Sequence, residues 1–308
     1  MSYALGFDLG GTHVKWVAVT PKGRLLNKGT FTTKDDPSHR RAPTFALWAG
    51  AIRDHLNEYA DKAGEPPSAV GIAAPGLAAT DSRSIAHMPG RLAGLEGLDW
   101  TDFLESDNLV PVLNDAHAAL LGEVWKGAAK GLKHVVLLTL GTGVGGAAME
   151  GGRLLKGCIG RAGHHGHLCL NPLGPPDVTG TPGSLEDAIG ECTVETRTHG
   201  RFSSTQALVE AHRAGDQEAT VVWLASIYCL ACGVTSLVNI LDPEAVVIGG
   251  GISAAGADLF EPLDDLLNRV EWRPGGHRVR VLPAKLGSYA GALGAARNAI
   301  ISTKKETP

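Results

Sequence analysis

The sequence predicts an α/β protein built from two related halves. Short apolar runs rich in valine alternate with longer helix-like segments along the 308 residues, which is typical of sheets covered by helices. A strand, a glycine-rich turn and a second strand occur near the N-terminus and again near residue 141. Glycine is unusually frequent, with 41 residues, about twice its average share of roughly 7%. Since no G-X-Y period is present, the glycines must serve turns and close backbone approaches.

The first half begins with a short strand, a glycine turn and a second strand. Valines and the short length favour strands over a helix at residues 3–7 and 14–19. Apolar residues at spacings of three and four then predict an amphipathic helix over residues 45–59. Two more short apolar runs predict strands at residues 69–74 and 109–113, and the next residues open a helix that continues to about residue 125.

The second half repeats this order. A strand is expected at residues 134–140, then a glycine turn, and the chain returns as a strand at residues 147–149. The elements expected after these are a helix at residues 219–241, a strand at 245–248, a helix at 255–270, a strand at 278–282 and a helix at 287–300. We expect the polar tail from residue 302 to be frayed.

Composition and charge exclude several function classes. Hydrophobic residues make up 44% and charged residues 19%, which excludes a disordered chain. The net charge of -4 excludes the basic surface of a dedicated nucleic-acid binder. Five cysteines are too few for a disulfide framework in a chain of this length. The N-terminus shows no signal peptide, so we expect a cytoplasmic protein.

One uncharged segment, at residues 219–241, is long enough to span a bilayer. It contains several Ser, Thr and Asn residues, and its flanks at Asp216, Glu218 and Asp242 are acidic. No Lys or Arg stands immediately beside it as a membrane anchor. A helix that is apolar on all sides is usually buried in a protein of this size, so we expect a core helix and no membrane partner.

The first glycine turn, which follows Asp8, is a candidate phosphate-binding site. Successive backbone N–H groups in such a turn can form an anion-binding nest. Asp8 at the end of the strand could hold Mg²⁺ through water. The alternative is an ordinary glycine hairpin, and the residues of this turn alone do not decide between them.

The second glycine turn, at residues 141–146, matches the G-x-G-x-x-G pattern of dinucleotide-binding proteins. That pattern requires a following helix and an acidic residue about 20 positions on. Here a strand follows, and histidines and glycines stand at that distance, so we reject a dinucleotide site. Neither turn contains the Lys of a P-loop.

Two polar clusters are further candidates. Asn114 and Asp115 stand between a predicted strand and helix, where an N-cap and a ligand-binding carboxylate are equally expected. Three histidines at positions 164, 165 and 167 superficially resemble a metal site. The nearest cysteines, at positions 158, 169 and 192, lie too far apart for the C-x₂₋₄-C spacing of structural zinc. Cys229 and Cys232 fall within the predicted core helix, where free cysteine acts as a small apolar residue.

In their order and spacing, these motifs resemble the ROK family of sugar kinases, repressors and open reading frames. The resemblance covers nearly the whole chain. The motifs that carry it are the turn at residues 8–12, Ala74-Pro75-Gly76, Asn114-Asp115, residues 140–146, Gly163-x-x-Gly166-His167, Gly183-x-Leu185-Glu186, residues 249–251 and Gly291-x-x-Gly294.

The resemblance implies an actin-like ATPase fold, in which two RNase H-like domains flank a cleft. The first domain would comprise residues 1–115 with a C-terminal helix at about 289–303, and the second residues 116–288. ATP and Mg²⁺ would be the cofactors, with Asp8 as the magnesium residue. The residues implied for ATP or its phosphates are Asp8, Gly10, Gly11, Thr12, Lys15, Gly141, Thr142, Gly143, Gly249, Gly250 and Gly251, and those implied for the sugar are Gly76, Asn114, Asp115, His164, His167 and Glu186.

The implied activity is phosphorylation of a hexose, with a glucose-like sugar as the first expectation. Asp115 matches the family's catalytic base, which accepts the proton of the sugar hydroxyl as that hydroxyl attacks the γ-phosphate. The alternatives to this kinase activity are a non-catalytic sugar sensor and a regulator without its DNA-binding domain. The family's repressors carry an N-terminal helix-turn-helix, for which the turn at residue 8 leaves no room here. Family members are often dimers, so we expect a homodimer and no nucleic-acid partner.

The sequence departs from the family pattern in two respects. The family's zinc motif combines the His of Gly-His with C-x-C-G-x-x-G-C, and its three cysteines are replaced by Asp177, Thr179 and Ser184. We therefore expect no zinc, and we expect packing and prolines to hold this loop. The Glu that binds sugar in the family's A-G-E-x-G-H is His164 here, so the identity of the sugar is open. His164 either lies in the sugar site or packs within its own loop.

Overall fold

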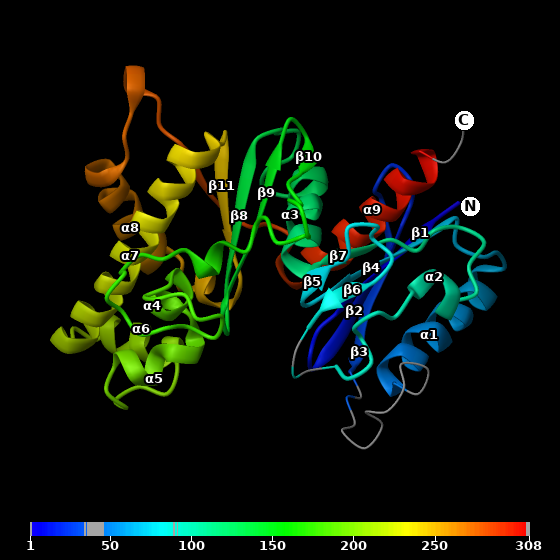
Figure 1. Cartoon of the computed structure of the whole chain (residues 1–308), viewed down its shortest axis with the longest axis horizontal. Helices are drawn as coiled ribbons and strands as arrows, with labels where there is room; N and C mark the ends of the chain where they lie inside the picture. Colours follow the sequence, from blue (N-terminus) through cyan, green and yellow to red (C-terminus); the bar gives the residue numbers. More distant parts are fainter. Residues whose placement is uncertain (1, 34, 36–45, 89, 91, 306–308) are drawn as a thin grey trace. The chain divides into compact units, whose positions relative to one another are not determined.

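The computed structural model describes residues 2–33, 35, 46–88, 90 and 92–305. The chain forms two compact units (Figure 1). The first unit comprises Met1–Gly131, Lys156–Ala162 and Lys285–Pro308, and the second comprises Leu132–Leu155 and Gly163–Ala284. The end of the chain thus returns to the first unit. The domain limits expected from the sequence, with a boundary after residue 115, stay a prediction.

The first unit is built on a five-stranded sheet in the order β3-β2-β1-β4-β7. β1 pairs antiparallel with β2 and parallel with β4, which in turn pairs parallel with β7. The strands are β1 (Ala4–Leu9), β2 (His13–Val19), β3 (Leu25–Thr32), β4 (Ala69–Ala74) and β7 (Val112–Asn114). β7 begins later than residue 109, where the sequence predicted it, because Pro111 has no N–H for the ladder and contributes only its carbonyl, which Ile72 N–H bonds.

Helices cover this sheet. The predicted apolar stripe of α1 (Leu47–Ala63) buries Trp48, Ala49 and Ile52 in the core, while Phe45 lies outside the described residues. The helix expected after Asn114 is α3 (Asp115–Lys126). The other elements among the described residues of this unit are β5 (Leu77–Ala78), β6 (Ile85–His87), α2 (Trp100–Phe103), η7 (Gly287–Tyr289) and α9 (Ala290–Lys305).

α9 lies directly against β1, β4 and α3, and glycines make this close approach feasible (Figure 1). A Cβ at Gly6 would overlap the carbonyl oxygen of Ala292, and a Cβ at Gly71 would overlap that of Ala295. The expectation of a frayed tail was wrong for residues 302–305, because α9 continues through Lys305. Ala299 and Ile300 are buried one turn earlier and hold this end of the helix on the sheet.

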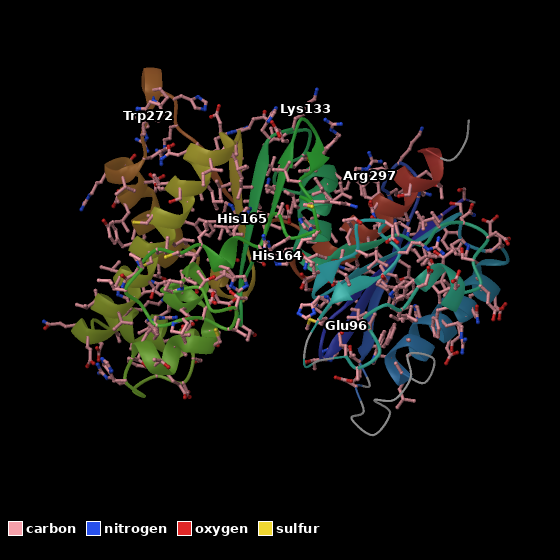
Figure 2. All side chains as sticks on the ribbon, viewed as in Figure 1. Glu96, Lys133, His164, His165, Trp272 and Arg297 are labelled. Carbon is pink, nitrogen blue, oxygen red and sulfur yellow. The ribbon has the colours of Figure 1, made fainter. Side chains whose placement is uncertain are left out.

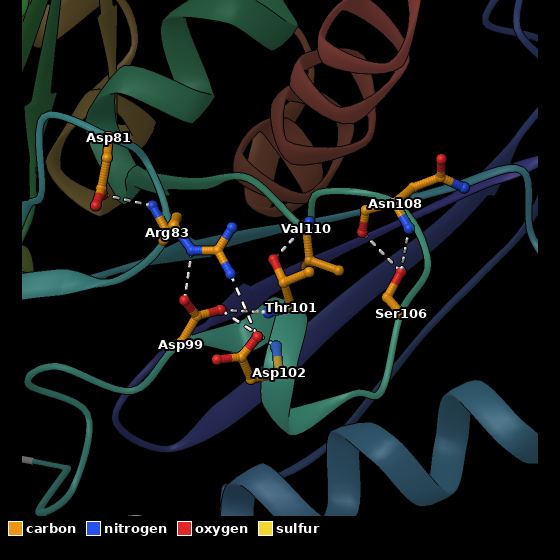
Figure 3. Close-up of polar contacts among 8 residues, drawn as sticks. All are labelled: Asp81, Arg83, Asp99, Thr101, Asp102, Ser106, Asn108 and Val110. Carbon is orange, nitrogen blue, oxygen red and sulfur yellow. Dashed lines mark hydrogen bonds and ion pairs between the residues drawn. The ribbon is translucent and has the colours of Figure 1, made fainter. Parts of the chain in front are cut away.

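A polar network organises the chain between β4 and β7 (Figure 3). The Arg83 guanidinium donates to Asp99 at 2.5 Å and to Asp102 at 3.3 Å. Asp99 also accepts the N–H groups of Thr101 and Asp102, so it caps α2. This segment therefore has its own fixed structure beside the loop that carries Gly76.

The second unit repeats the topology of the first. Its five-stranded sheet has the order β10-β9-β8-β11-β12, with two antiparallel pairings followed by two parallel ones. The strands are β8 (Val135–Leu140), β9 (Val144–Glu150), β10 (Arg153–Leu154), β11 (Ala245–Gly249) and β12 (Arg280–Pro283). The prediction of two related halves is confirmed by these matching strand orders.

The longest helix of this unit is α7 (Gln217–Leu241). Among the described residues it alone has the length and composition of a membrane span. One of its faces, which includes Trp223, Ile227 and Leu230, lies in the core beside β8 and β11. The expected burial on all sides is met only in part, because Val221 and Ile240 on this helix are exposed. The other helical elements are η3 (His165–His167), α4 (Leu185–Ile189), η4 (Glu191–Thr193), α5 (Val194–Arg197), α6 (Thr205–Arg213), η5 (Gly251–Ala255), α8 (Ala257–Val270) and η6 (Pro274–Gly276).

Candidate active site

In the first unit, the predicted site residues gather at the carboxyl ends of parallel strands. Asp8 lies near the end of β1, Gly76 follows β4, and Asn114 ends β7. Because these three strands are parallel neighbours, their ends meet at one edge of the sheet, where α/β proteins bind ligands.

Asp8 and Asp115 form a pair of interacting carboxylates at this edge. Burial raises the pKa of Asp8 to about 7, and the charge of Asp115 acts in the same direction, while Lys15 on β2 opposes both. Lys15 stands directly opposite Asp8 in the strand register. Asp8 also lies against the first turn of α9, where a Cβ on Gly291 would be only 2.5 Å from its Oδ2. Gly291 therefore leaves the space that this carboxylate occupies.

Asp115 is the first residue of α3, and its side chain is exposed. Its Oδ1 accepts the N–H of Ala116 at 2.8 Å. Desolvation raises the pKa of Asp115, although hydrogen bonds and Lys15 partly oppose this effect. An exposed carboxylate whose affinity for a proton is increased has the properties of a general base.

Asn114 holds the start of α3, and with it Asp115, in place. Its Oδ1 accepts the N–H groups of Ala116 and His117, so it is the N-cap of α3 that the sequence allowed. Its Nδ2 donates to the carbonyl of Gly76 at 2.9 Å. Gly76 has a positive φ of 98°, and a Cβ there would be 2.6 Å from the carbonyl oxygen of His87. Asn114 thus joins the Gly76 turn to the start of the helix that carries Asp115.

The turn between β1 and β2 presents Gly11 and Thr12 to solvent. Gly10 N–H bonds the carbonyl of His13, and the Thr33 hydroxyl donates to the carbonyl of Gly10 at 2.7 Å. The carbonyl side of this turn is therefore held by the residue that follows β3. Nothing lies within 4 Å of a Cβ built on Gly11, so the exposed part of the turn has room for a ligand.

The residues around Asp8 suit a magnesium ion that is held partly by substrate. Magnesium usually takes one or two carboxylates and completes its shell with water and phosphate. Two carboxylates that repel each other are the kind of arrangement that a divalent cation stabilises. The described residues contain no group of three or more His, Cys, Asp or Glu that could hold a metal by themselves. The site therefore fits Mg²⁺ bound together with nucleotide phosphates.

In the second unit, the turn between β8 and β9 contacts Glu186 of α4. Glu186 Oε2 accepts the N–H of Val144 at 2.9 Å, and a Cβ on Gly143 would overlap this oxygen. The carbonyls of Gly141 and Thr142 accept N–H groups from the first residues of η4. These bonds fix the turn, and they join a predicted phosphate-binding segment to a predicted sugar-binding residue.

A pocket of about 540 Å³ opens beside this turn. It lies entirely within the second unit, between the turn, α6 and η5. Its lining residues are Gly141, Thr142, Glu191, Thr205, Gln206, Val209, Glu210, Arg213, Gly251, Ile252, Ala254 and Ala255. Three of them, Gly141, Thr142 and Gly251, were predicted to contact nucleotide.

Thr205 is a polar group of this pocket that the sequence analysis missed. Its hydroxyl is buried and has no hydrogen-bond partner among the described residues. Its N–H donates to Glu191 at 2.8 Å, which fixes the start of α6 against the pocket. Buried hydroxyls are normally satisfied, so an unsatisfied one in a pocket wall indicates a ligand or water partner.

The glycine turn after β11 is shaped by close packing. Gly250 has a φ of 88°, and a Cβ there would overlap the backbone of Leu140. A Cβ on Gly249 would be 2.9 Å from the Cβ of Ala284. Gly251 is exposed and borders the pocket, so of these three predicted residues it alone lines the cavity.

The histidine segment follows β10 and packs against β9 through η3 (Figure 2). His164 is half-buried and precedes η3, and His165 is buried against Gly146. His167 keeps 27% of its side chain exposed. Its Nδ1 lies 2.8 Å from Oδ2 of Asp177.

The structure thus brings the predicted residues together in two groups. The first unit holds Asp8, Gly10, Gly11, Thr12, Lys15, Gly76, Asn114 and Asp115, and the second holds Gly141, Thr142, Gly143, His164, His167, Glu186, Gly249, Gly250 and Gly251. Sequence reasoning missed Glu191, the pocket residues of α6, the part of η5 after Gly251 and the bond between Asp177 and His167. Ser204, whose side chain caps α6, and the apolar pair Leu208 and Val209 were the available signals for that helix.

Comparison with known proteins places these groups in context. A family model described as the ROK family matches residues 4–301. A glucokinase from Halalkalibacterium halodurans is 32% identical, over 94% of this chain and 92% of its own length. The crystal structure of a ROK hexokinase from Thermus thermophilus superposes with a TM-score of 0.86 at 31% identity, over 98% of this chain and 99% of that one. A ROK family glucokinase from Streptomyces griseus, solved with glucose and AMPPNP, gives a TM-score of 0.76 at 27% identity, over 97% and 99% of the two chains.

Proposed function

The chain belongs to the ROK family, and on that premise we propose a substrate, a base and a nucleotide site for its reaction. Its fold is the actin-like ATPase fold, and it is an ATP-dependent sugar kinase. The sugar and the residues that act on it are inferred from the two units and from the protein's relatives.

We propose that the substrate is a glucose-like hexose. The relatives support this choice, since two are glucokinases and one is a hexokinase. Within this chain, Glu186 and His167 lie in the same unit on adjoining segments, and α4 contacts η3. A carboxylate and an imidazole together offer the acceptors and donors that sugar hydroxyls require.

Asp115 is the proposed general base, and the geometry of the first unit carries this assignment. Its carboxylate is exposed at the end of β7, its pKa is raised by desolvation, and Asn114 fixes the helix on which it stands. The carboxylate would accept the proton of the attacking sugar hydroxyl. Phosphoryl transfer depends mainly on alignment of the reacting groups and on stabilisation of charge. A carboxylate that orients the attacking hydroxyl and accepts its proton contributes to this alignment.

The pocket of the second unit is the proposed site for the nucleoside part of ATP. Its volume of about 540 Å³ is within the range of small-molecule sites, roughly 300–1,000 Å³. The Thr205 hydroxyl would supply a hydrogen bond to the nucleoside. The glycine turn at residues 141–143 borders this pocket and is a proposed phosphate-binding segment, and the turn at residues 8–12 is the one proposed for the first unit.

Asp8 is the residue that would hold Mg²⁺, through water and with the phosphates. A bound magnesium ion neutralises charge on the phosphates during transfer. Lys15, opposite Asp8 in the sheet, adds a second positive charge to the same edge.

A coupled ADP-release assay with a panel of hexoses tests the proposed substrate. We expect ADP release that depends on sugar, with the highest kcat/KM for glucose or a close epimer. ATP consumption that no hexose increases would contradict the kinase proposal and favour a sugar sensor.

The variant His164→Glu restores the family residue, and a change in the ranking of sugars at similar ATP KM would place His164 in the sugar site.

Three expectations accompany this proposal. A regulator without its DNA-binding domain is the second candidate function for this chain. Sugar-dependent ADP release in the assay above would argue against it. We expect a homodimer, which sedimentation or light scattering measures directly. We also expect a cytoplasmic location.

A further inference from the structure

We propose that Asp177 positions His167 and fixes its Nδ1-protonated tautomer, so that Nε2 is presented to the sugar as a hydrogen-bond acceptor. This inference rests on the proposed function, in which His167 contacts the sugar. It assigns a role to a residue that stands where the family has a zinc-binding cysteine.

Asp177 is the centre of a compact set of hydrogen bonds, which we call the Asp177 hub: Asp177 with His167, Thr179 and Thr181. Asp177 Oδ1 accepts the N–H of Thr179, the hydroxyl of Thr179 and the N–H of Thr181, at 2.8, 2.8 and 2.9 Å. Its Oδ2 lies 2.8 Å from His167 Nδ1. The Asp177 side chain is fully buried. Every partner is therefore held in place by one carboxylate.

The carboxylate in this hub is ionised. Burial alone would raise the pKa of Asp177, but the hydrogen bonds from His167, Thr179 and Thr181 outweigh burial and hold the pKa well below its usual range. An ionised carboxylate only accepts hydrogen bonds, so the proton between Asp177 and His167 belongs to Nδ1 of the ring. In a neutral imidazole, Nε2 then carries a lone pair.

These residues do not fit the zinc ion that the family pattern implies. Structural zinc takes four Cys, His or carboxylate ligands, and here Thr179 and Ser184 replace two of the cysteines. Both Asp177 oxygens already accept hydrogen bonds, and the Ser184 hydroxyl accepts the N–H of Asp187 as the cap of α4. The hub thus connects residues 177–181 to η3 through hydrogen bonds alone.

The carboxylate sets the polarity of the other ring nitrogen of His167, Nε2. A histidine that binds a metal through Nδ1 carries its hydrogen on Nε2 and donates there. In the Asp177 hub the hydrogen is on Nδ1, so Nε2 accepts. The sugar hydroxyl that contacts His167 is then required to donate.

Long-range ¹H–¹⁵N correlation spectra of histidine-labelled protein test the tautomer, with His167→Gln to assign the signal. We expect a protonated Nδ1 and a bare Nε2 in the ligand-free wild type. A wild-type ring protonated on Nε2 alone overturns the inference, and this measurement requires no variant at Asp177.

Asp177→Asn provides the functional arm. Its carboxamide oxygen can keep the three donors from Thr179 and Thr181, which leaves the NH₂ group facing His167. The ring must then carry its hydrogen on Nε2. We expect the tautomer to invert and the sugar KM to rise about tenfold, as one hydrogen bond is lost, with an unchanged ATP KM. The exposed Asp265→Asn on α8 removes the same charge and should alter neither value.

The outcomes separate this inference from the proposed function. Hexose phosphorylation by the wild type tests the function, and the variant tests Asp177. An inverted tautomer with an unchanged sugar KM overturns the inference while the kinase assignment stands. About one equivalent of zinc in the purified protein, whose removal raises the sugar KM, also overturns it. Protein that binds sugar equally with and without chelator supports it.

Discussion

At the scale of single residues, the carboxylates of the first unit have separate tasks set by their surroundings. Asp8 is held between β2 and the first turn of α9, where burial and neighbouring charge raise its pKa to about 7. Asp115 is exposed at the start of α3 and accepts the N–H of Ala116. A half-buried carboxylate suits a cation, and an exposed one suits contact with a substrate hydroxyl.

Replacing Asp115 with Asn tests the proposed base. Asn has the same shape but cannot accept the proton, so we expect kcat to fall by roughly 10²–10⁴-fold. Asn114 supplies the helix cap, so the thermal unfolding midpoint should change little. Steady-state kinetics and a thermal melt measure both. Turnover within about threefold of wild type would show that Asp115 is only a helix-terminal residue.

Thr205→Val tests the nucleoside pocket. Valine keeps the shape and the N–H bond to Glu191 but removes the buried hydroxyl, so ATP loses one hydrogen bond. We expect the ATP KM to rise about fivefold, with the sugar KM unchanged. Thr235→Val on α7 is a matched control, because its hydroxyl is also buried without a partner among the described residues and lies outside the pocket lining. Equal effects of the two variants on ATP KM would remove the pocket assignment.

Asp99→Asn gives a pH-dependent prediction for the network of Figure 3. Burial raises the pKa of Asp99, but the bonds from Arg83 and backbone N–H groups outweigh it, so the pKa lies below its ordinary value of 3.8. The ionised Asp99 therefore stabilises the folded state above about pH 4. This stabilisation is lost as the pH falls through the lower pKa that Asp99 has in the folded state. We expect the variant to lose about 1 kcal/mol at pH 7, because Asn retains the cap but not the ion pair. Thermal melts should show that the difference in stability between wild type and Asp99→Asn shrinks toward pH 3. A difference that grows toward pH 3 would show that the pKa of Asp99 is not lowered in the folded state.

At the scale of elements, glycines decide how α9 packs. Gly6 on β1, Gly71 on β4 and Gly122 on α3 all lie where a Cβ would overlap backbone atoms of α9. Backbone atoms cannot rotate away as side chains can, so each of these positions requires glycine. The high glycine content is thus partly explained by helix packing, in addition to ligand turns.

Gly71→Ala should destabilise the first unit by about 1–3 kcal/mol, because the new methyl group displaces α9. Gly50→Ala on α1 is the matched control. Nothing lies within 4 Å of a Cβ there, and alanine favours a helix interior over glycine by about 0.5–1 kcal/mol. Chemical denaturation of both variants should therefore give shifts of opposite sign. A stabilised Gly71→Ala protein would show that α9 does not approach β4 so closely.

Sequence patterns predicted the elements that bury a continuous apolar stripe or run. The strand at residues 69–74 and the long α7 fall in this group, because burial leaves a plain periodicity. β3 was missed because most of its residues are exposed and its apolar pattern is weak. The short helices α4 and α5 were missed for a similar reason, since each has only four or five residues.

For the candidate site, sequence reasoning identified residues through short ordered motifs and missed those set by tertiary contacts. Asp177 was visible only as a replaced cysteine, because its bond to His167 depends on where η3 places that ring. Packing and prolines were expected to hold this loop, and the Asp177 hub adds a polar cross-link to them. Thr205 was missed because its burial beside the turn at Gly141 depends on how α6 packs.

At the scale of the whole molecule, the first unit depends on a segment that is remote in the sequence. Glu123 is fully buried, and its Oε1 accepts the N–H groups of Lys285 and Leu286 as the chain returns from the second unit. Its Oε2 accepts the N–H of Ala128 at 2.6 Å. One carboxylate thus fixes both the end of α3 and the approach to α9.

Deleting residues 285–308 should therefore unfold the first unit and leave the second one folded. The deletion removes the helix that covers β1 and β4, and it leaves the buried side chain of Glu123 without two of its donors. Hydrogen exchange measured by mass spectrometry should show β1 and β4 unprotected and β8 and β11 protected. Protected β1 and β4 in the deletion variant would show that the first unit is stable without α9.

The return of α9 also sets an order of events during protein synthesis. The strands of the first unit leave the ribosome before the second unit is made, and roughly 160 further residues separate Gly131 from α9. At 5–20 residues per second, translation of that stretch takes about 8–32 s. Throughout this interval the glycine-lined faces of β1 and β4 are without their covering helix. A nascent chain of this protein is thus exposed to aggregation for seconds, and chaperones that bind emerging apolar strands would have their main target in its first 131 residues.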